Sequence, residues 1–197
     1  KNDAILRVDP NSLDTLLHPT LDEKSSIQVI ANGLPASPGA ASGKVVFTSE
    51  EAERLNSMMQ DTILVRVETS PEDIQGMHAA KGILTSRGGM TSHAAVVARG
   101  MGRPCVSGSS EIEINYDKKV FKTSSAEVKE GETITIDGST GRIILGTVPT
   151  IKPEISGDFS KLMSWADKIR KLKVRTNSET PLDSKTAREF GAEGIGL

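Results

Sequence analysis

A histidine that follows a glycine pair is the part of this sequence best suited to chemistry. Its surroundings fall within six consecutive positions, which include Gly88, Gly89, Thr91, Ser92 and His93. Glycines let a ligand approach the backbone closely, and Thr91 or Ser92 is a natural N-cap for a helix that starts beside His93. A helix N-terminus offers unpaired N–H groups and partial positive charge, which disfavour imidazolium and attract an anion. His93 is therefore predicted to be a neutral nucleophile at an anion-binding site.

Two arginines flank this segment and are predicted to add charge-assisted contacts. Arg87 precedes the glycine pair, and Arg99 follows His93 within the predicted helix. The residues alone leave another interpretation open, since a first-turn histidine is more often a surface residue and a glycine loop also binds anions without covalent chemistry. A non-catalytic anion-binding module is that alternative. His18 and His78 are predicted to be structural, as is Cys105.

The elements that must position this segment form an alternating pattern between residues 27 and 146. Apolar, β-branched runs predict strands at 27–30, 44–47, 63–67, 82–85, 105–107, 133–136 and 142–145. Helical spacing predicts helices at 50–59, 71–80 and 92–101. Residues 137–141 (Asp-Gly-Ser-Thr-Gly) are typical of a tight hairpin. Together these elements indicate an α/β fold in which helices pack on a compact mixed sheet.

The flanks differ from this core. Residues 1–26 are predicted to be the tail of a preceding nucleotide-binding region and a linker, with a short strand at 4–8. Residues 148–172 indicate a linker and a helix that begins near Phe159, and residues 173–197 indicate the strand–helix–strand start of a second domain. The chain does not begin with Met and ends in an apolar run, so we expect it to be a piece of a longer protein.

Composition excludes several classes of function. The 197 residues carry 24 Lys and Arg against 26 Asp and Glu, which leaves a formal charge of −2 and no basic surface for nucleic acid or a membrane. Apolar runs are far shorter than the roughly 20 residues of a membrane-spanning helix. The single cysteine excludes an internal disulfide and fits a reducing compartment, so we expect a cytoplasmic location.

Read as a whole, residues 88–99 (Gly-Gly-Met-Thr-Ser-His-Ala-Ala-Val-Val-Ala-Arg) resemble the phosphohistidine signature of the phosphoenolpyruvate-utilising enzymes. Met90 and the Arg-Gly-Met-Gly at 99–102 resemble the dikinase branch, because the other branches usually carry Arg at the Met90 position. One departure is Arg103-Pro104-Cys105, where dikinases often have Lys-Cys-Cys. Further segments similar to that branch are residues 13–19, 33–43, 65–74, 174–177 and 191–197.

The resemblance implies a swivelling three-layer β/β/α phosphohistidine domain over residues 27–147, followed from 173 by the start of a (β/α)8 barrel. His93 would become a tele-phosphohistidine that is carried between an ATP-grasp domain and the barrel, with hinges near 20–33 and 147–160. The enzyme would be a phosphotransferase that converts ATP, phosphate and pyruvate to AMP, diphosphate and phosphoenolpyruvate. The alternative enzyme is the phosphoenolpyruvate synthase branch. The chain by itself is not expected to turn over.

The resemblance also implies cofactors and regulation. Magnesium would be held by the flanking domains, so no metal site is expected in this chain. Thr91 matches a position that a regulatory kinase phosphorylates in some dikinases. A phosphate there would add about −1.5 to −2 charges beside His93. Thr91 as a simple cap is the competing interpretation. The whole enzyme would be a homodimer through its barrel, and this chain a monomer.

Overall fold

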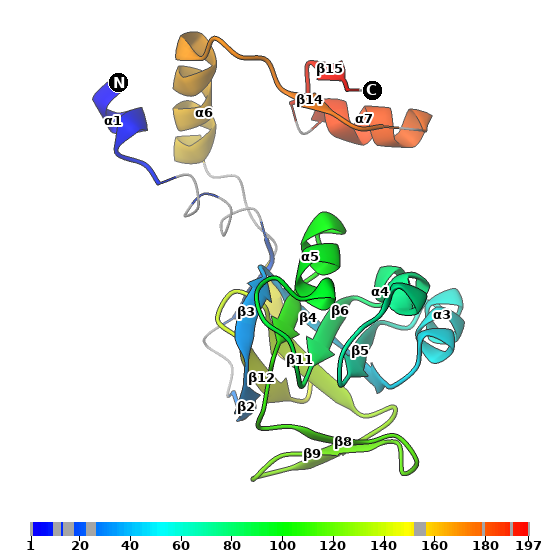
Figure 1. Cartoon of the computed structure of the whole chain (residues 1–197). Coiled ribbons are helices and arrows are strands. Elements are labelled where there is room, and N and C mark those ends of the chain that lie inside the picture. Colours follow the sequence, from blue (N-terminus) through cyan, green and yellow to red (C-terminus); the bar gives the residue numbers. More distant parts are fainter. Residues whose placement is uncertain are drawn as a thin grey trace. The chain divides into compact units, whose positions relative to one another are not determined.

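The structure is a computed structural model, and it describes residues 2–9, 13, 18–22, 27–151, 157–178, 180–189 and 191–196. The chain divides into two compact units (Figure 1). One unit comprises residues 10–154, and the other comprises residues 1–9 together with 155–197. The glycine–histidine segment belongs to the first of these, which we call the carrier unit.

A mixed sheet of eight strands forms the centre of the carrier unit, in the order β2-β12-β11-β4-β5-β6-β7-β3. The strands β4, β5, β6 and β7 are parallel neighbours, and the remaining pairs are antiparallel. The bounds are β2 Val29–Asn32, β3 Leu34–Ser37, β4 Ala40–Val46, β5 Thr62–Arg66, β6 Gly82–Thr85, β7 Cys105–Ser107, β11 Thr133–Asp137 and β12 Arg142–Leu145. The predicted mixed sheet is confirmed, with β3 as a strand that the sequence pattern did not predict.

Register decides which loops meet at the edge of this sheet. Arg66 at the end of β5 pairs with Thr85 at the end of β6, and Leu84 pairs with Val106 of β7. The carboxyl ends of these parallel strands therefore lie together, and the loops that follow β5 and β6 leave the same edge. Open α/β sheets place their ligand sites at such an edge.

Helices follow three of the parallel strands, as the sequence predicts. They are α3 Ser49–Ser57, the 3-10 turn η1 Pro71–Asp73 continued by α4 Ile74–Ala79, and α5 His93–Gly100. The Thr48 side chain caps α3 by accepting a hydrogen bond from the Glu51 amide at 3.2 Å. The apolar faces of the helices pack on one another and on the sheet in one buried cluster, which includes Leu55, Met77 and Ala98.

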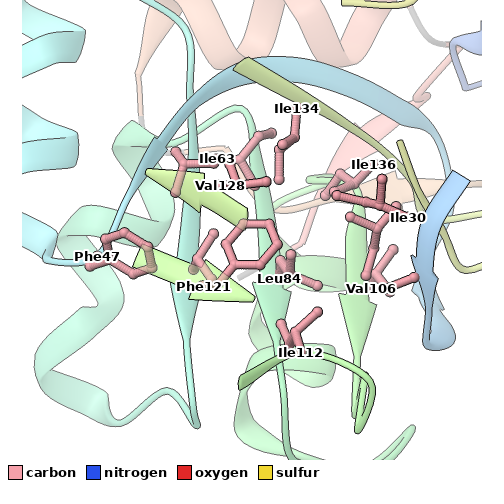
Figure 2. Close-up of a cluster of buried hydrophobic side chains, with 14 residues drawn as sticks. Ile30, Phe47, Ile63, Leu84, Val106, Ile112, Phe121, Val128, Ile134 and Ile136 are labelled. Carbon is pink, nitrogen blue, oxygen red and sulfur yellow. The ribbon is translucent and has the colours of Figure 1, made fainter. Parts of the chain in front are cut away.

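A second, smaller sheet contributes to another buried cluster (Figure 2). Its three antiparallel strands have the order β10-β9-β8. Their bounds are β8 Glu113–Asn115, β9 Val120–Lys122 and β10 Glu127–Lys129. Phe121 and Val128 from this sheet pack with side chains of the large sheet, such as Leu84. The sequence pattern did not predict these strands, because each has three residues and mostly exposed or part-buried ends.

The two ends of the carrier unit are tied to each other. Strand β1 (Thr20–Leu21) pairs antiparallel with β13 (Thr150–Ile151). Leu21 is buried in a small cluster with Ala40, Ile144 and Val148. The chain therefore enters and leaves this unit along neighbouring paths.

The other unit contains α1 Asn2–Leu6, α6 Gly157–Ile169, β14 Arg175–Thr176, α7 Pro181–Glu189 and β15 Gly194–Ile195. The predicted strand at 4–8 is wrong, because Asn2–Leu6 is a short helix that packs against α6. The strand–helix–strand order after residue 173 is confirmed, and β14 and β15 are parallel. No helix among the described residues is long and apolar enough to cross a membrane.

Candidate functional site

The glycine–histidine segment joins β6 to α5, and His93 is the first residue of the helix. Of the two predicted caps, Ser92 is the N-cap, and its hydroxyl accepts a hydrogen bond from the Ala95 amide at 3.4 Å. The buried residues Ala94, Ala95 and Ala98 hold α5 against the rest of the carrier unit. His93 itself stays part-buried at the start of the helix, as predicted from the sequence.

A threonine from the neighbouring loop contacts the imidazole ring. The Thr69 hydroxyl lies 3.0 Å from Nδ1 of His93, although the two residues are 24 positions apart in the chain. Thr69 follows β5, so the paired ends of β5 and β6 bring it to the histidine. This contact occupies Nδ1, and the tautomer of the ring decides which of the two atoms donates. Thr69 was not among the predicted site residues, since no local pattern connects it to His93.

The glycine loop packs closely on the loop that follows β7. Gly88 has φ of +112°, and a Cβ there would lie 2.9 Å from the Ser92 Cβ. Gly108 has φ of +64°, and a Cβ there would lie 2.2 Å from the Gly88 carbonyl oxygen. A Cβ on Gly89 would meet nothing within 4 Å. Positions 88 and 108 therefore require glycine, because their φ is positive and a Cβ would have no room. At Gly89 a Cβ would have room.

Buried hydroxyl groups lie beneath the loop. The Thr85 hydroxyl donates to the Ser107 hydroxyl at 3.2 Å, and the Ser107 and Ser92 hydroxyls are 3.3 Å apart. Thr85 and Ser107 are fully buried. These three hydroxyl groups connect the ends of β6 and β7 to the N-cap of α5, and each gives its neighbour the hydrogen-bond partner that a buried polar group needs. Ser107 is a further residue that the sequence did not single out.

A cavity of about 270 Å³ opens beside His93. Its lining residues are Glu68, Thr69, Arg87, Gly88, Ser92, His93 and Ala94. Arg87 thus shares the cavity with His93. A larger cavity of about 550 Å³ lies elsewhere on the carrier unit, near His18 and Arg103, and holds none of the predicted site residues.

The other predicted residues lie around this cavity rather than in its lining. Thr91 is exposed. Arg99 donates hydrogen bonds from Nε to the Ala36 carbonyl at 2.7 Å and from a terminal nitrogen to the Met90 carbonyl, so its guanidinium holds the loop to β3.

Burial raises the pKa of the Cys105 thiol to about 12, which keeps it protonated near neutral pH. Within the described part of the chain, no three His, Cys, Asp or Glu side chains gather as a metal site.

The sequence of this chain is similar to those of known proteins. Residues 58–141 match the family described as "PEP-utilising enzyme, mobile domain". Pyruvate, phosphate dikinase of Rhizobium meliloti (strain 1021) is 58% identical over all of this chain and 22% of its own length. Pyruvate, phosphate dikinase 2 of Zea mays is 58% identical over 98% of this chain and 22% of its own, and the Clostridium symbiosum dikinase is 55% identical over 100% and 23%.

This chain therefore spans about a fifth of the length of these curated relatives. Among solved structures, a solution structure of an Enzyme I protein aligns at 24% identity, with a TM-score of 0.33, over 57% of this chain and 40% of its own.

Proposed function

Because this chain belongs to the phosphoenolpyruvate-utilising enzyme family, we propose that it is the phosphoryl-carrier part of a pyruvate, phosphate dikinase, with His93 as the phosphorylated residue. The observation that carries the proposal is the pairing of His93 Nδ1 with the Thr69 hydroxyl at the N-terminus of α5. His93 lines a cavity at the N-terminus of this helix, where the first backbone N–H groups have no partner within the helix.

The step at His93 is a displacement at phosphorus. In the tautomer that we propose, Nδ1–H donates to the Thr69 hydroxyl 3.0 Å away, so Nε2 keeps its lone pair and needs no base. Nε2 attacks the phosphorus of the donor, a bond from nitrogen to phosphorus forms, and the bond from phosphorus to the leaving oxygen breaks with its electron pair. The product is a tele-phosphohistidine. The amides of the first turn and Arg87 stabilise the anionic group once it has arrived.

The rest of the proposed reaction is what the family resemblance implies. The β-phosphoryl group of ATP passes to His93 and the γ-phosphoryl group to inorganic phosphate, and pyruvate then takes the group from His93. The products are AMP, diphosphate and phosphoenolpyruvate. Magnesium would serve the charged phosphates in the flanking domains, as the family resemblance implies. ATP-grasp and barrel domains of the same cytoplasmic, dimeric enzyme are the partners.

We also assign the carrier unit as a swivelling three-layer β/β/α domain over residues 27–147. Two buried clusters support this assignment, one shared by the small and large sheets and the other by the large sheet and the helices. The β1–β13 pair holds the two connections beside each other, which supports hinges in those parts of 20–33 and 147–160 that lie outside the paired strands β1, β2 and β13. Residues 1–26 would then be the preceding tail, 148–172 a linker with a helix, and 173–197 the start of the barrel, whose parallel β14 and β15 fit that role.

Thr91 is the proposed regulatory position. Its side chain is exposed, two residues before His93, where a protein kinase and a phosphatase can reach it. A phosphate on Thr91 would repel the incoming phosphoryl group from the same helix N-terminus.

The test is transfer of a labelled phosphoryl group. The chain is incubated with phosphoenolpyruvate labelled on phosphorus and with the remaining domains of a dikinase as separate polypeptides. We expect acid-labile, base-stable label on the chain. His93→Asn should abolish it, and His78→Asn, a change at an exposed histidine of α4, should leave it unchanged. Equal labelling of His93→Asn and the parent would refute the carrier function and favour an anion-binding module.

A further inference from the structure

We propose that Asp73 is a positioning residue for this site: it fixes the segment that carries Thr69 and thereby sets the tautomer of His93. Asp73 is 5% exposed, yet it is remote from His93 in sequence and takes no part in the step described above. The inference rests on the proposed function and deepens it, because it concerns how the nucleophile is prepared.

The Asp73 carboxylate joins three elements. One oxygen, Oδ2, accepts a hydrogen bond from the Ser70 amide at 2.9 Å. The other, Oδ1, accepts one from the Ser49 hydroxyl at 3.0 Å and lies 3.4 Å from Nε of Arg66. Ser70 is the neighbour of Thr69, Arg66 ends β5, and Ser49 begins α3. A single buried side chain therefore anchors the C-terminal end of the segment 67–70.

The N-terminal end of this segment is anchored separately. The Val67 amide donates to the Tyr116 hydroxyl at 2.8 Å, and the Val67 carbonyl accepts from the Arg87 amide at 2.9 Å. The Arg66 guanidinium lies 5.4 Å from the centroid of the Tyr116 ring. Thr69 thus lies between two fixed points, and one of them depends on the carboxylate of Asp73.

The anchoring by Asp73 affects His93 through the hydroxyl of Thr69. The hydrogen bond on one ring nitrogen decides which nitrogen carries the proton. If the segment loosens, the Thr69 hydroxyl no longer holds the proton on Nδ1, and the tautomer with a proton on Nε2 gains population. That tautomer has no lone pair on Nε2 and cannot attack phosphorus. Asp73 is expected to act by this route, without touching the reacting atoms.

Nitrogen-15 NMR of the 197-residue chain tests the proposal directly. With labelled histidine, the parent should show a protonated Nδ1 and a pyridine-type Nε2 on His93. Asp73→Asn keeps the size of the side chain but removes its charge and one acceptor, so the His93 shifts should move toward the other tautomer. Thr69→Val should move them in the same direction.

The matched control is Asp137→Asn. Asp137 is also 5% exposed, accepts a hydrogen bond from the Ser139 amide at 3.0 Å and pairs with Arg142 at 3.0 Å, but it lies in the β11–β12 hairpin. Asp137→Asn should lower the stability of the chain about as much as Asp73→Asn does, and it should leave the nitrogen-15 shifts of His93 as in the parent. Ser49→Ala, which removes only the hydroxyl that donates to Oδ1 of Asp73, is the mild variant and decides the matter if Asp73→Asn does not fold.

The labelling assay supplies the second readout. At saturating phosphoenolpyruvate, Asp73→Asn should slow labelling about tenfold, the effect of losing about 1.4 kcal/mol of transition-state stabilisation. Asp137→Asn should change the rate less than twofold. Parent-like His93 shifts in Asp73→Asn, or altered shifts with a parent-like rate, would overturn the proposal. Label on a His93→Asn chain would instead overturn the proposed function, so the two failures are distinguishable.

Discussion

At the scale of single residues, the imidazole ring of the candidate nucleophile His93 contacts a hydroxyl group that comes from another loop. An imidazole ring without a fixed partner exchanges its proton between two nitrogens, whereas the Thr69 hydroxyl, 3.0 Å from Nδ1, can hold one tautomer. The cavity beside the ring is lined by one acidic and one basic side chain, Glu68 and Arg87. Added charge at this site should therefore alter phosphoryl transfer.

Thr91 gives the prediction at this scale. Thr91→Glu places a negative charge two residues from His93, and we expect labelling from phosphoenolpyruvate to slow by about tenfold, because like charges repel at the helix N-terminus. Thr91→Gln has nearly the same shape without the charge and should remain within about twofold of the parent. Rates measured at low and at high salt check the cause, since screening should reduce the Glu effect. Equal loss in both variants would indicate a steric role for Thr91.

At the scale of elements, the site depends on how two glycine-containing loops fit at the ends of β6 and β7. Gly88 and Gly108 both have positive φ, and the Gly88 carbonyl occupies the space where a Cβ on Gly108 would be. The buried hydroxyls of Thr85 and Ser107 continue the contact beneath the loops. The position of His93 is therefore set by strand ends and loop packing as well as by its helix.

Alanine substitutions at the glycines test this packing. Gly108→Ala should lower the free energy of unfolding by about 1–3 kcal/mol, because the added Cβ meets backbone and the positive φ disfavours alanine. Gly89→Ala, with open space around its Cβ, should change it by less than about 0.5 kcal/mol. Urea unfolding at equilibrium measures both variants. A stability loss at Gly89 as large as that at Gly108 would contradict the described packing.

At the scale of the whole molecule, the carrier unit is closed by the pairing of its two ends. Strands β1 and β13 are only two residues each, yet they bury Leu21 with Val148. The Val148 amide also donates to the buried Thr135 hydroxyl at 3.0 Å. We expect a unit closed in this way to fold by itself.

Two truncated chains test this closure. Residues 18–151 retain β1 and β13, whereas residues 27–147 lack both strands, Leu21 and Val148. The shorter chain should be less stable by about 1.5–3 kcal/mol or more, which is the contribution expected from burying one leucine side chain. Thermal unfolding of both chains, beside the full 197 residues, measures the difference. Equal stability of the two truncations would show that the β1–β13 pair does not close the unit.

The sequence by itself predicted most strands of the large sheet and the helices that follow them, and it singled out His93 as the candidate nucleophile, but it did not predict β3 or the strands of the small sheet. Apolar periodicity located the strands from 82 and 105 and the helix that His93 begins, because these signals repeat within a few residues. The run of glycine, threonine, serine and histidine indicated an anion site for the same local reason. The resemblance to a known family then predicted that the anion bound at His93 is a phosphoryl group.

Only the tertiary structure decided what surrounds His93. Thr69 reaches the ring, Asp73 fixes Thr69, and Gly108 packs on the glycine loop; each depends on strand register or on contacts between loops far apart in sequence. The guanidinium of Arg99 holds backbone carbonyls of the loop and of β3 for the same reason. Periodicity reports which face of an element is buried, but it does not report which side chain of another element will meet it.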